Sequence, residues 1–220
     1  GVGGGMALAG AIIVGPRIGK YMPDGSVKPM PAHNFPLAAL GVLILWLGWF
    51  GFNGGSELAI DADVGRIVLV TNLAAAAGFC GALTWIRIRS GLLDLSMALN
   101  GALAGLVGIT AGCYNITGGW SIVVGIVAGI LCVEGVFLVD KMKVDDPVGA
   151  ITVHGICGMF GTIAVGLVGY GNAATGEEPM GLLVGGGASQ LGIQAMGPLA
   201  GVALAFIVGA IAWPALQFLV

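Results

Sequence analysis

Residues 145–161 read Asp-Asp-Pro-Val-Gly-Ala-Ile-Thr-Val-His-Gly-Ile-Cys-Gly-Met-Phe-Gly. The opening of this stretch is a helix start signal. The Asp146 carboxylate can accept hydrogen bonds from free backbone N–H groups, and Pro147 suits the first helical position because it has no N–H to satisfy. The sequence then stays apolar to about Tyr170, which is long enough to cross a bilayer.

His154 lies within this apolar run. At about 1.5 Å of rise per residue, it lies roughly 10 Å from the start of the span, which approaches the middle of a membrane. An ionisable side chain at that depth is costly and marks a functional site by default. We therefore interpret His154 as a site residue, and Asp146 as the structural cap of its helix rather than a catalytic group.

The composition places the whole chain in lipid. It is 57% hydrophobic and only 9% charged, whereas an ordinary soluble domain carries about 25% charged residues. The four cysteines lie in or beside apolar runs without metal-like spacing, so we interpret them as small packing residues rather than metal ligands or disulfide partners.

Apolar runs of spanning length predict a single transmembrane domain over residues 1–220. The expected spans are 1–15, 37–57, 65–86, 95–115, 119–139, 147–170 and 195–217, of which the first is the second half of a span. Small-residue faces such as Gly101-x-x-x-Gly105 and Gly125-x-x-x-Gly129 predict close helix contacts. Glu134, near the inner end of its span, is expected to contact another helix or to reach the interface.

The charged loops predict the orientation. Alternate loops contain seven of the eight basic residues: Arg17, Lys20, Lys28, Arg87, Arg89, Lys141 and Lys143. The positive-inside rule places these loops, and the C-terminal end, in the cytoplasm of a multi-pass protein of the plasma or inner membrane. The opposite loops are acidic and contain Glu57, Asp61, Asp63, Glu177 and Glu178.

Three further motifs occur in order with residues 145–158. They are Gly-Pro-Arg-Ile-Gly-Lys (15–20), Gly-Trp-Phe-Gly-Phe-Asn-Gly-Gly-Ser (48–56) and Asn-Gly-Ala-Leu-Ala-Gly-Leu (100–106). Together the four motifs closely resemble the Amt/Mep/Rh ammonium transporter family, Amt branch. The similarities extend nearly from end to end of the chain.

The resemblance implies an all-α, polytopic fold of two inverted five-helix repeats followed by an eleventh helix. This chain would supply the end of the fifth helix, the second repeat and the last helix. Gly1-Val2-Gly3-Gly4 shares a Gly-aliphatic-small-Gly pattern with residues 155–158, so a second pore histidine is expected immediately before Gly1. The native polypeptide is therefore expected to begin upstream.

The same resemblance implies a substrate pathway through four residues of this chain. Ser56 would help to hold the cation at the outer mouth, Phe52 would be one of two stacked gate rings, Trp49 would line the pore, and His154 would be one of two paired histidines. The family's other gate phenylalanine and its outer aromatic and aspartate would lie upstream. No metal, cofactor or nucleic acid is implied.

The chemistry of a buried histidine fits such a path. Removing water from a cation is costly in an apolar lumen, but ammonium, unlike potassium, can avoid that cost by releasing a proton. A neutral imidazole can donate and accept hydrogen bonds and relay a proton. We therefore predict an ammonium transporter or channel, with methylammonium as an analogue. The resemblance also implies a homotrimer and a cytoplasmic PII-type regulator.

Three alternatives remain open at this stage. An Amt-like membrane sensor, signalling through a fused or bound cytoplasmic domain, would use the same outer site. Transport could carry net charge or neutral gas, and another neutral gas could use the same path. An enzyme is not predicted, because a second catalytic carboxylate, a nucleophile and a metal set are lacking. The sequence beyond Val220 would distinguish a transporter's regulatory tail from a sensor's signalling domain.

Overall fold

The computed structural model describes residues 1–171 and 180–218. Regular structure in these ranges is helical, apart from isolated bridge residues at Tyr21, Val27 and Tyr170, of which Tyr21 and Val27 pair with each other in antiparallel fashion. The elements are α1 (Val2–Val14), α2 (Phe35–Gly55), α3 (Ala62–Ser90), α4 (Leu95–Thr110), α5 (Gly118–Lys141), η1 (Ile151–Ile156), α6 (Cys157–Val168), η2 (Leu182–Val184) and α7 (Ala188–Gln217). Here η1 is π-helical and η2 is a single 3₁₀ turn.

Five helices in the described part of the chain are long and apolar enough to cross a membrane, judged by length and composition. They are α2, α3, α5, the continuous η1–α6 helix, and α7. The helices α1 and α4 are apolar but shorter. The predicted all-α, polytopic membrane architecture is therefore confirmed.

Two helices begin four or more residues away from the start expected for their spans. The turn after Pro147 includes Gly149, whose φ of 76° lies in the left-handed region, so η1 begins only at Ile151. The last helix begins at Ala188 rather than near 195, because its first polar residues lower the hydropathy without preventing a helix. The connection between the spans expected at 147–170 and 195–217 therefore ends at Gly187, and its residues 172–179, with Glu177 and Glu178, lie outside the described ranges.

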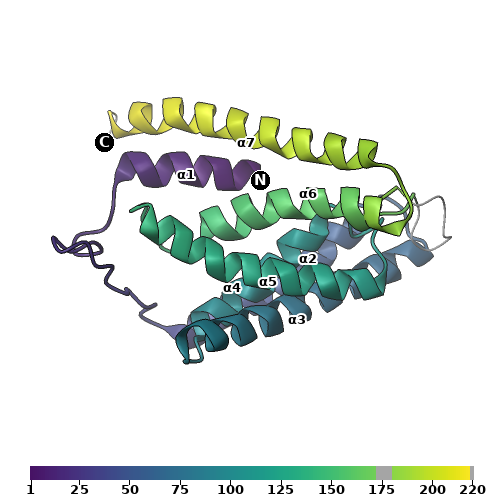
Figure 1. The fold of residues 1–220 in the computed structure, drawn as a ribbon, viewed down its shortest axis with the longest axis horizontal. Helices are drawn as coiled ribbons and strands as arrows, with labels where there is room; N and C mark the ends of the chain where they lie inside the picture. Colours follow the sequence, from purple (N-terminus) through teal and green to yellow (C-terminus); the bar gives the residue numbers. More distant parts are fainter. Residues whose placement is uncertain (172–179, 219–220) are drawn as a thin grey trace.

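The helices run alternately in opposite directions across the molecule (Figure 1). The connection after α1, the turn after α3, the connection after α5 and the end of α7 all lie at the left of the view. These are the segments that contain or adjoin seven of the eight basic residues. α1 lies directly beside α7, and the chain's first residue lies near the middle of the bundle.

Close glycine contacts join α3 to α4 and α5. A Cβ atom added to Gly105 on α4 would lie 2.1 Å from the Ala74 carbonyl oxygen, and one added to Gly125 on α5 would lie 2.3 Å from the same oxygen. A Cβ on Gly129 would lie 2.3 Å from the Gly78 oxygen. The contact faces predicted for 101–105 and 125–129 are thus confirmed, because only glycine allows the backbones to approach so closely.

Glu134 also joins α5 to α3. Its carboxylate accepts a hydrogen bond from Trp85 Nε1 at 2.7 Å and pairs with Arg89 at 3.0 Å. The Arg89 guanidinium also lies 4.4 Å from the centre of the Phe137 ring. Of the two roles expected for Glu134, helix contact is therefore the one observed.

Candidate functional site

His154 lies in the π-helical turn at the start of the membrane-spanning η1–α6 helix. The wider turn is closed by a hydrogen bond from the Cys157 N–H to the Thr152 carbonyl. Thr152 and Val153 are buried, while the His154 side chain is only partly buried. Single π turns within α-helices often occur at functional sites, since they change the direction in which a side chain points.

Asp146 holds the start of this turn. Its Oδ1 accepts a hydrogen bond from the Ala150 N–H at 2.9 Å, and its Oδ2 accepts one from the Ile151 N–H at 2.8 Å. These are N–H groups at a helix start, which have no partner within the helix. Asp146 is not the residue directly before the helix. Its carboxylate reaches these N–H groups from the other side of the turn at Gly149.

α1 crosses the His154 helix at glycine contacts. A Cβ atom added to Gly4 would lie 2.2 Å from Gly155 Cα and 2.9 Å from the His154 carbonyl carbon. A Cβ added to Gly158 would lie 2.7 Å from the Gly1 nitrogen. If Gly1–Gly4 is aligned with Gly155–Gly158, Gly1 corresponds to Gly155 and Gly4 corresponds to Gly158. Replacing each residue by its counterpart then turns the Gly4–Gly155 contact into the Gly158–Gly1 contact. The pairing is therefore the one expected for two segments related by a local two-fold axis.

The predicted outer residues lie along one side of α2. Trp49 and Phe52 meet edge to face, with ring centres 6.1 Å apart and an angle of 61° between the planes. Trp49 Nε1 donates to Thr110 Oγ1 on α4 at 2.7 Å, which fixes the indole ring. Phe52 is 63% exposed. The Ser56 hydroxyl donates to the Phe52 carbonyl at 2.6 Å, so its oxygen lone pairs remain free to accept a hydrogen bond.

The structure brings three of the four predicted pathway residues together. Trp49 and Phe52 lie on the last turns of α2 and Ser56 is its C-cap, and α2 packs against α3 and α4. His154 lies on η1, which packs against α1, α4, α5 and α6. α4 therefore contacts both parts, and the ring contact between Trp49 and Phe52 on α2 does not involve His154.

Some buried polar groups of this region were not found from the sequence. The Asn53 side chain on α2 donates to Thr71 Oγ1 on α3 at 3.0 Å, and both residues are fully buried. Asn53 Oδ1 and Thr152 Oγ1 are buried without a hydrogen-bond partner. Polar residues within apolar spans are the signal that could have found them, since such groups are placed in lipid only at a cost.

Among the described residues, one group of carboxylates has ligand-like spacing, and it lies where α2 ends and α3 begins. Oxygens of Glu57, Asp61 and Asp63 lie within 4.8 Å of one another. Asp61 accepts a hydrogen bond from the Asp63 N–H as the cap of α3, and Asp63 pairs with Arg66 at 3.1 Å. Two of the three carboxylates thus have structural partners, and the group is ordinary for a helix start.

Comparison with known proteins identifies the class of this protein. The model of the Ammonium Transporter Family matches residues 1–220, and the chain belongs to that family. It is 46% identical over 190 residues to the ammonium transporter Amt2 of Archaeoglobus fulgidus, a match that covers 84% of this chain and 40% of that protein. It is 44% identical over 173 residues to a putative ammonium transporter of Synechocystis, covering 76% of this chain and 39% of that protein.

Solved structures give the same result. The fold superposes on a protein named "Sensor Amt Protein" with a TM-score of 0.87 and 40% identity, covering 98% of this chain and 52% of that one. It superposes on Candida albicans Mep2 with a TM-score of 0.86 and 32% identity, covering 96% of this chain and 47% of that one. The chain spans about 40% of the length of the curated relatives named above.

Proposed function

We propose that this chain forms part of an ammonium transporter or channel that conducts ammonium or ammonia across a membrane. Support comes from membership of the family and from relatives that are named ammonium transporters rather than enzymes. The single observation that carries the pathway assignment is the placement of His154. It is a partly buried imidazole, in a π turn of a spanning helix, beside the glycine crossing with α1.

The crossing also supports an inverted repeat with its site at the midplane. Transporters of that kind place the substrate site near the bilayer midplane, where the two repeats meet. The exchange symmetry of the Gly4–Gly155 and Gly158–Gly1 contacts is what such a repeat requires. A histidine immediately before Gly1 would then lie at the position that corresponds to His154, and the two would form the pair.

The proposed mechanism separates ions by dehydration. Ser56 offers an acceptor oxygen at the outer end, where a cation can still be partly hydrated. Below it, the apolar Phe52 ring offers little to a bare cation, so entry of potassium is costly. Ammonium can release its proton and proceed as ammonia, and the His154 imidazole can accept, donate or relay hydrogen bonds on the way.

A second function, ammonium sensing, is favoured by one observation. The similar structure named "Sensor Amt Protein" has 40% identity to this chain. A sensor would bind the ion at the same outer residues and pass the change to a fused or bound cytoplasmic domain. The two functions differ in whether ammonium binding is accompanied by flux.

The assembly and orientation are also proposals. We place the C-terminal end in the cytoplasm, because the basic connections lie together at the end of the bundle where α7 ends. We further propose a homotrimer and a cytoplasmic PII-type regulator. Crosslinking in the native membrane and co-purification from cells supplied with ammonium would test these two partners.

The test of the pathway is His154→Ala in proteoliposomes, with the protein produced with its natural flanking sequence. We expect the variant to lose ammonium flux or to lose selectivity against potassium. His33→Ala is the matched control, since His33 lies in the exposed connection before α2 and has no role in the proposal. Selective ammonium uptake that is the same in the His154 variant and the wild type would contradict the assignment.

A further inference from the structure

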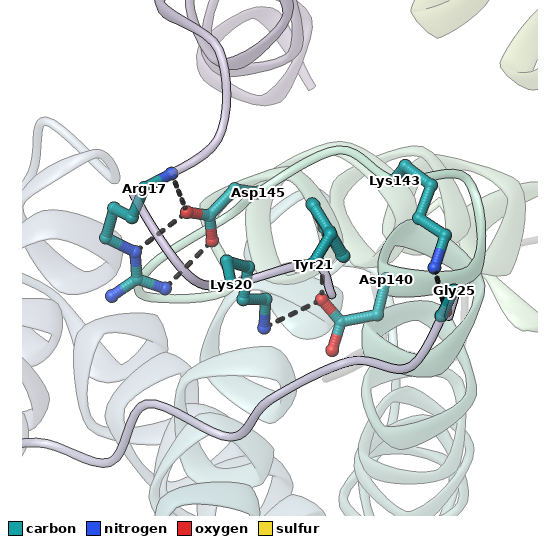
Figure 2. Close-up of polar contacts among 7 residues, drawn as sticks. All are labelled: Arg17, Lys20, Tyr21, Gly25, Asp140, Lys143 and Asp145. Carbon is teal, nitrogen blue, oxygen red and sulfur yellow. Dashed lines mark hydrogen bonds and ion pairs between the residues drawn. The ribbon is translucent and has the colours of Figure 1, made fainter. Parts of the chain in front are cut away.

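The connection between α1 and α2, residues 15–34, is bound to the connection that leads into the His154 helix (Figure 2). Arg17 donates from its backbone N–H and from Nε to Asp145 Oδ2, each at 2.8 Å, and from Nη2 to Oδ1 at 2.8 Å. Asp145 is only 4% exposed, so both oxygens of a nearly buried carboxylate are occupied by one residue. Bidentate arginine–carboxylate contacts of this kind are strong and directional.

A second set of contacts lies beside the first (Figure 2). Lys20 Nζ lies 2.9 Å from Asp140 Oδ1, and Lys143 Nζ donates to the Gly25 carbonyl oxygen. The Tyr21 ring lies 5.9 Å from Lys20 Nζ and 5.0 Å from Lys143 Nζ. A connection with almost no regular structure of its own is therefore fixed, although ordering such a segment costs conformational entropy.

The Arg17–Asp145 contact stays charged over the neutral range. The hydrogen bonds from Arg17 hold the pKa of Asp145 below its ordinary value, and the same contact raises the pKa of Arg17. Figure 2 shows the two side chains facing each other across the two connections. The contact does not depend on proton exchange near neutral pH.

This contact gives α1 and the His154 helix a second point of attachment. The first is the crossing at Gly4 and Gly155. From Gly4 to the end of α1 at Val14 is about 15 Å at 1.5 Å per residue. Two helices that touch at one crossing can still change the angle between their axes. A second contact, between the connections just outside the two helices, fixes that angle. Asp145 directly precedes Asp146, whose carboxylate holds the first N–H groups of the His154 helix.

We propose that Arg17 and Asp145 are positioning residues. They keep the inner ends of α1 and of the His154 helix together, and the path beside His154 therefore stays too narrow for a hydrated ion. The proposal rests on the proposed function. Neither residue touches the transported species. Without the contact the two helices separate at their inner ends, water enters the path, and potassium no longer has to lose its hydration shell.

The chain offers a closely matched control for this proposal. Arg17 and Arg89 each pair with a carboxylate, at 2.8 and 3.0 Å, and their side chains are 40% and 42% exposed. Arg89 joins α3 to α5 instead, through its contacts with Glu134 and Phe137. A general effect of removing a surface arginine would therefore occur in both Arg17→Ala and Arg89→Ala.

The experiment measures potassium and ammonium fluxes in the same proteoliposomes, with the protein produced with its natural flanking sequence. We expect the potassium-to-ammonium ratio to rise at least tenfold in Arg17→Ala and to remain at the wild-type value in Arg89→Ala. Asp145→Ala removes all three hydrogen bonds and should have the largest effect. Arg17→Lys keeps the charge but not the bidentate contact, so its ratio should lie between those of wild type and Arg17→Ala.

An equal ratio in Arg17→Ala and Arg89→Ala, with ammonium flux intact, overturns the proposal. If Asp145→Ala does not reach the membrane, the two Arg17 variants decide the question. Hydrogen–deuterium exchange of residues 145–156 gives a readout that is independent of flux, and it should be faster in Arg17→Ala than in Arg89→Ala. If the wild-type protein passes no ammonium, the proposed function is overturned instead. Hydrogen–deuterium exchange then still tests the positioning contact, and equal exchange in Arg17→Ala and Arg89→Ala would overturn it.

Discussion

Replacing Gly4 by alanine tests the contact between α1 and the His154 helix with the smallest change available. The new Cβ atom would lie 2.2 Å from both the nitrogen and the Cα of Gly155, where an ordinary contact is at least 3.4 Å. The two backbones would therefore have to separate by about 1.2 Å, which is 3.4 less 2.2. Overpacking of this kind costs about 1–3 kcal/mol, because backbone atoms cannot rotate away as a side chain can.

The matched control is the preceding residue. A Cβ atom at Gly3 would have no neighbour within 4 Å, so Gly3→Ala should be neutral or slightly stabilising through better helix propensity. We expect Gly4→Ala to lower the midpoint of thermal unfolding in detergent and to reduce ammonium flux in proteoliposomes. Equal midpoints and equal fluxes in the two variants would show that α1 does not pack on the His154 helix as described.

Two further predictions concern groups at the basic end of the bundle. Asp146→Ala should destabilise the protein by about 0.5–2 kcal/mol, since it removes a cap from two N–H groups; an unchanged unfolding midpoint would contradict that role. Burial, together with the charges of Asp140 and Asp145, raises the pKa of Tyr21 to about 12, so one tyrosine should ionise late in an ultraviolet titration. Because the pKa is raised in the folded state, the stabilisation is complete below about pH 10 and is lost as the pH rises toward 12. Asp140→Asn should lower this pKa, and a late ionisation that survives Tyr21→Phe would refute the assignment.

The spans and the glycine faces could be predicted from the sequence because both depend on local composition. An apolar run has to be helical in lipid, and a small-residue repeat has to face another helix. The same reasoning identified His154 as an ionisable group at depth. It could not find the π turn around it, because one extra residue in a turn leaves no trace in a run that is apolar on every side.

Other features depended on contacts far apart in the chain. Arg17 and Asp145 each lie in a quoted motif, but their pairing joins residues separated by 128 positions and has no signal in spacing.

The start of the His154 helix was expected at Pro147, but Gly149 has a left-handed backbone conformation and the helix begins only after it. The resemblance to the family supplied the roles of Trp49, Phe52 and Ser56, which their own positions on α2 would not have suggested.

The central claim is that ions are separated by the loss of water, and that only a species able to release a proton crosses the apolar part of the path. Its most direct test is the wild-type flux of ammonium and of potassium, measured in the same proteoliposomes under equal gradients. The account predicts ammonium flux with potassium flux at the level of protein-free vesicles. Comparable fluxes of the two ions, or saturable ammonium binding without any flux, would contradict it.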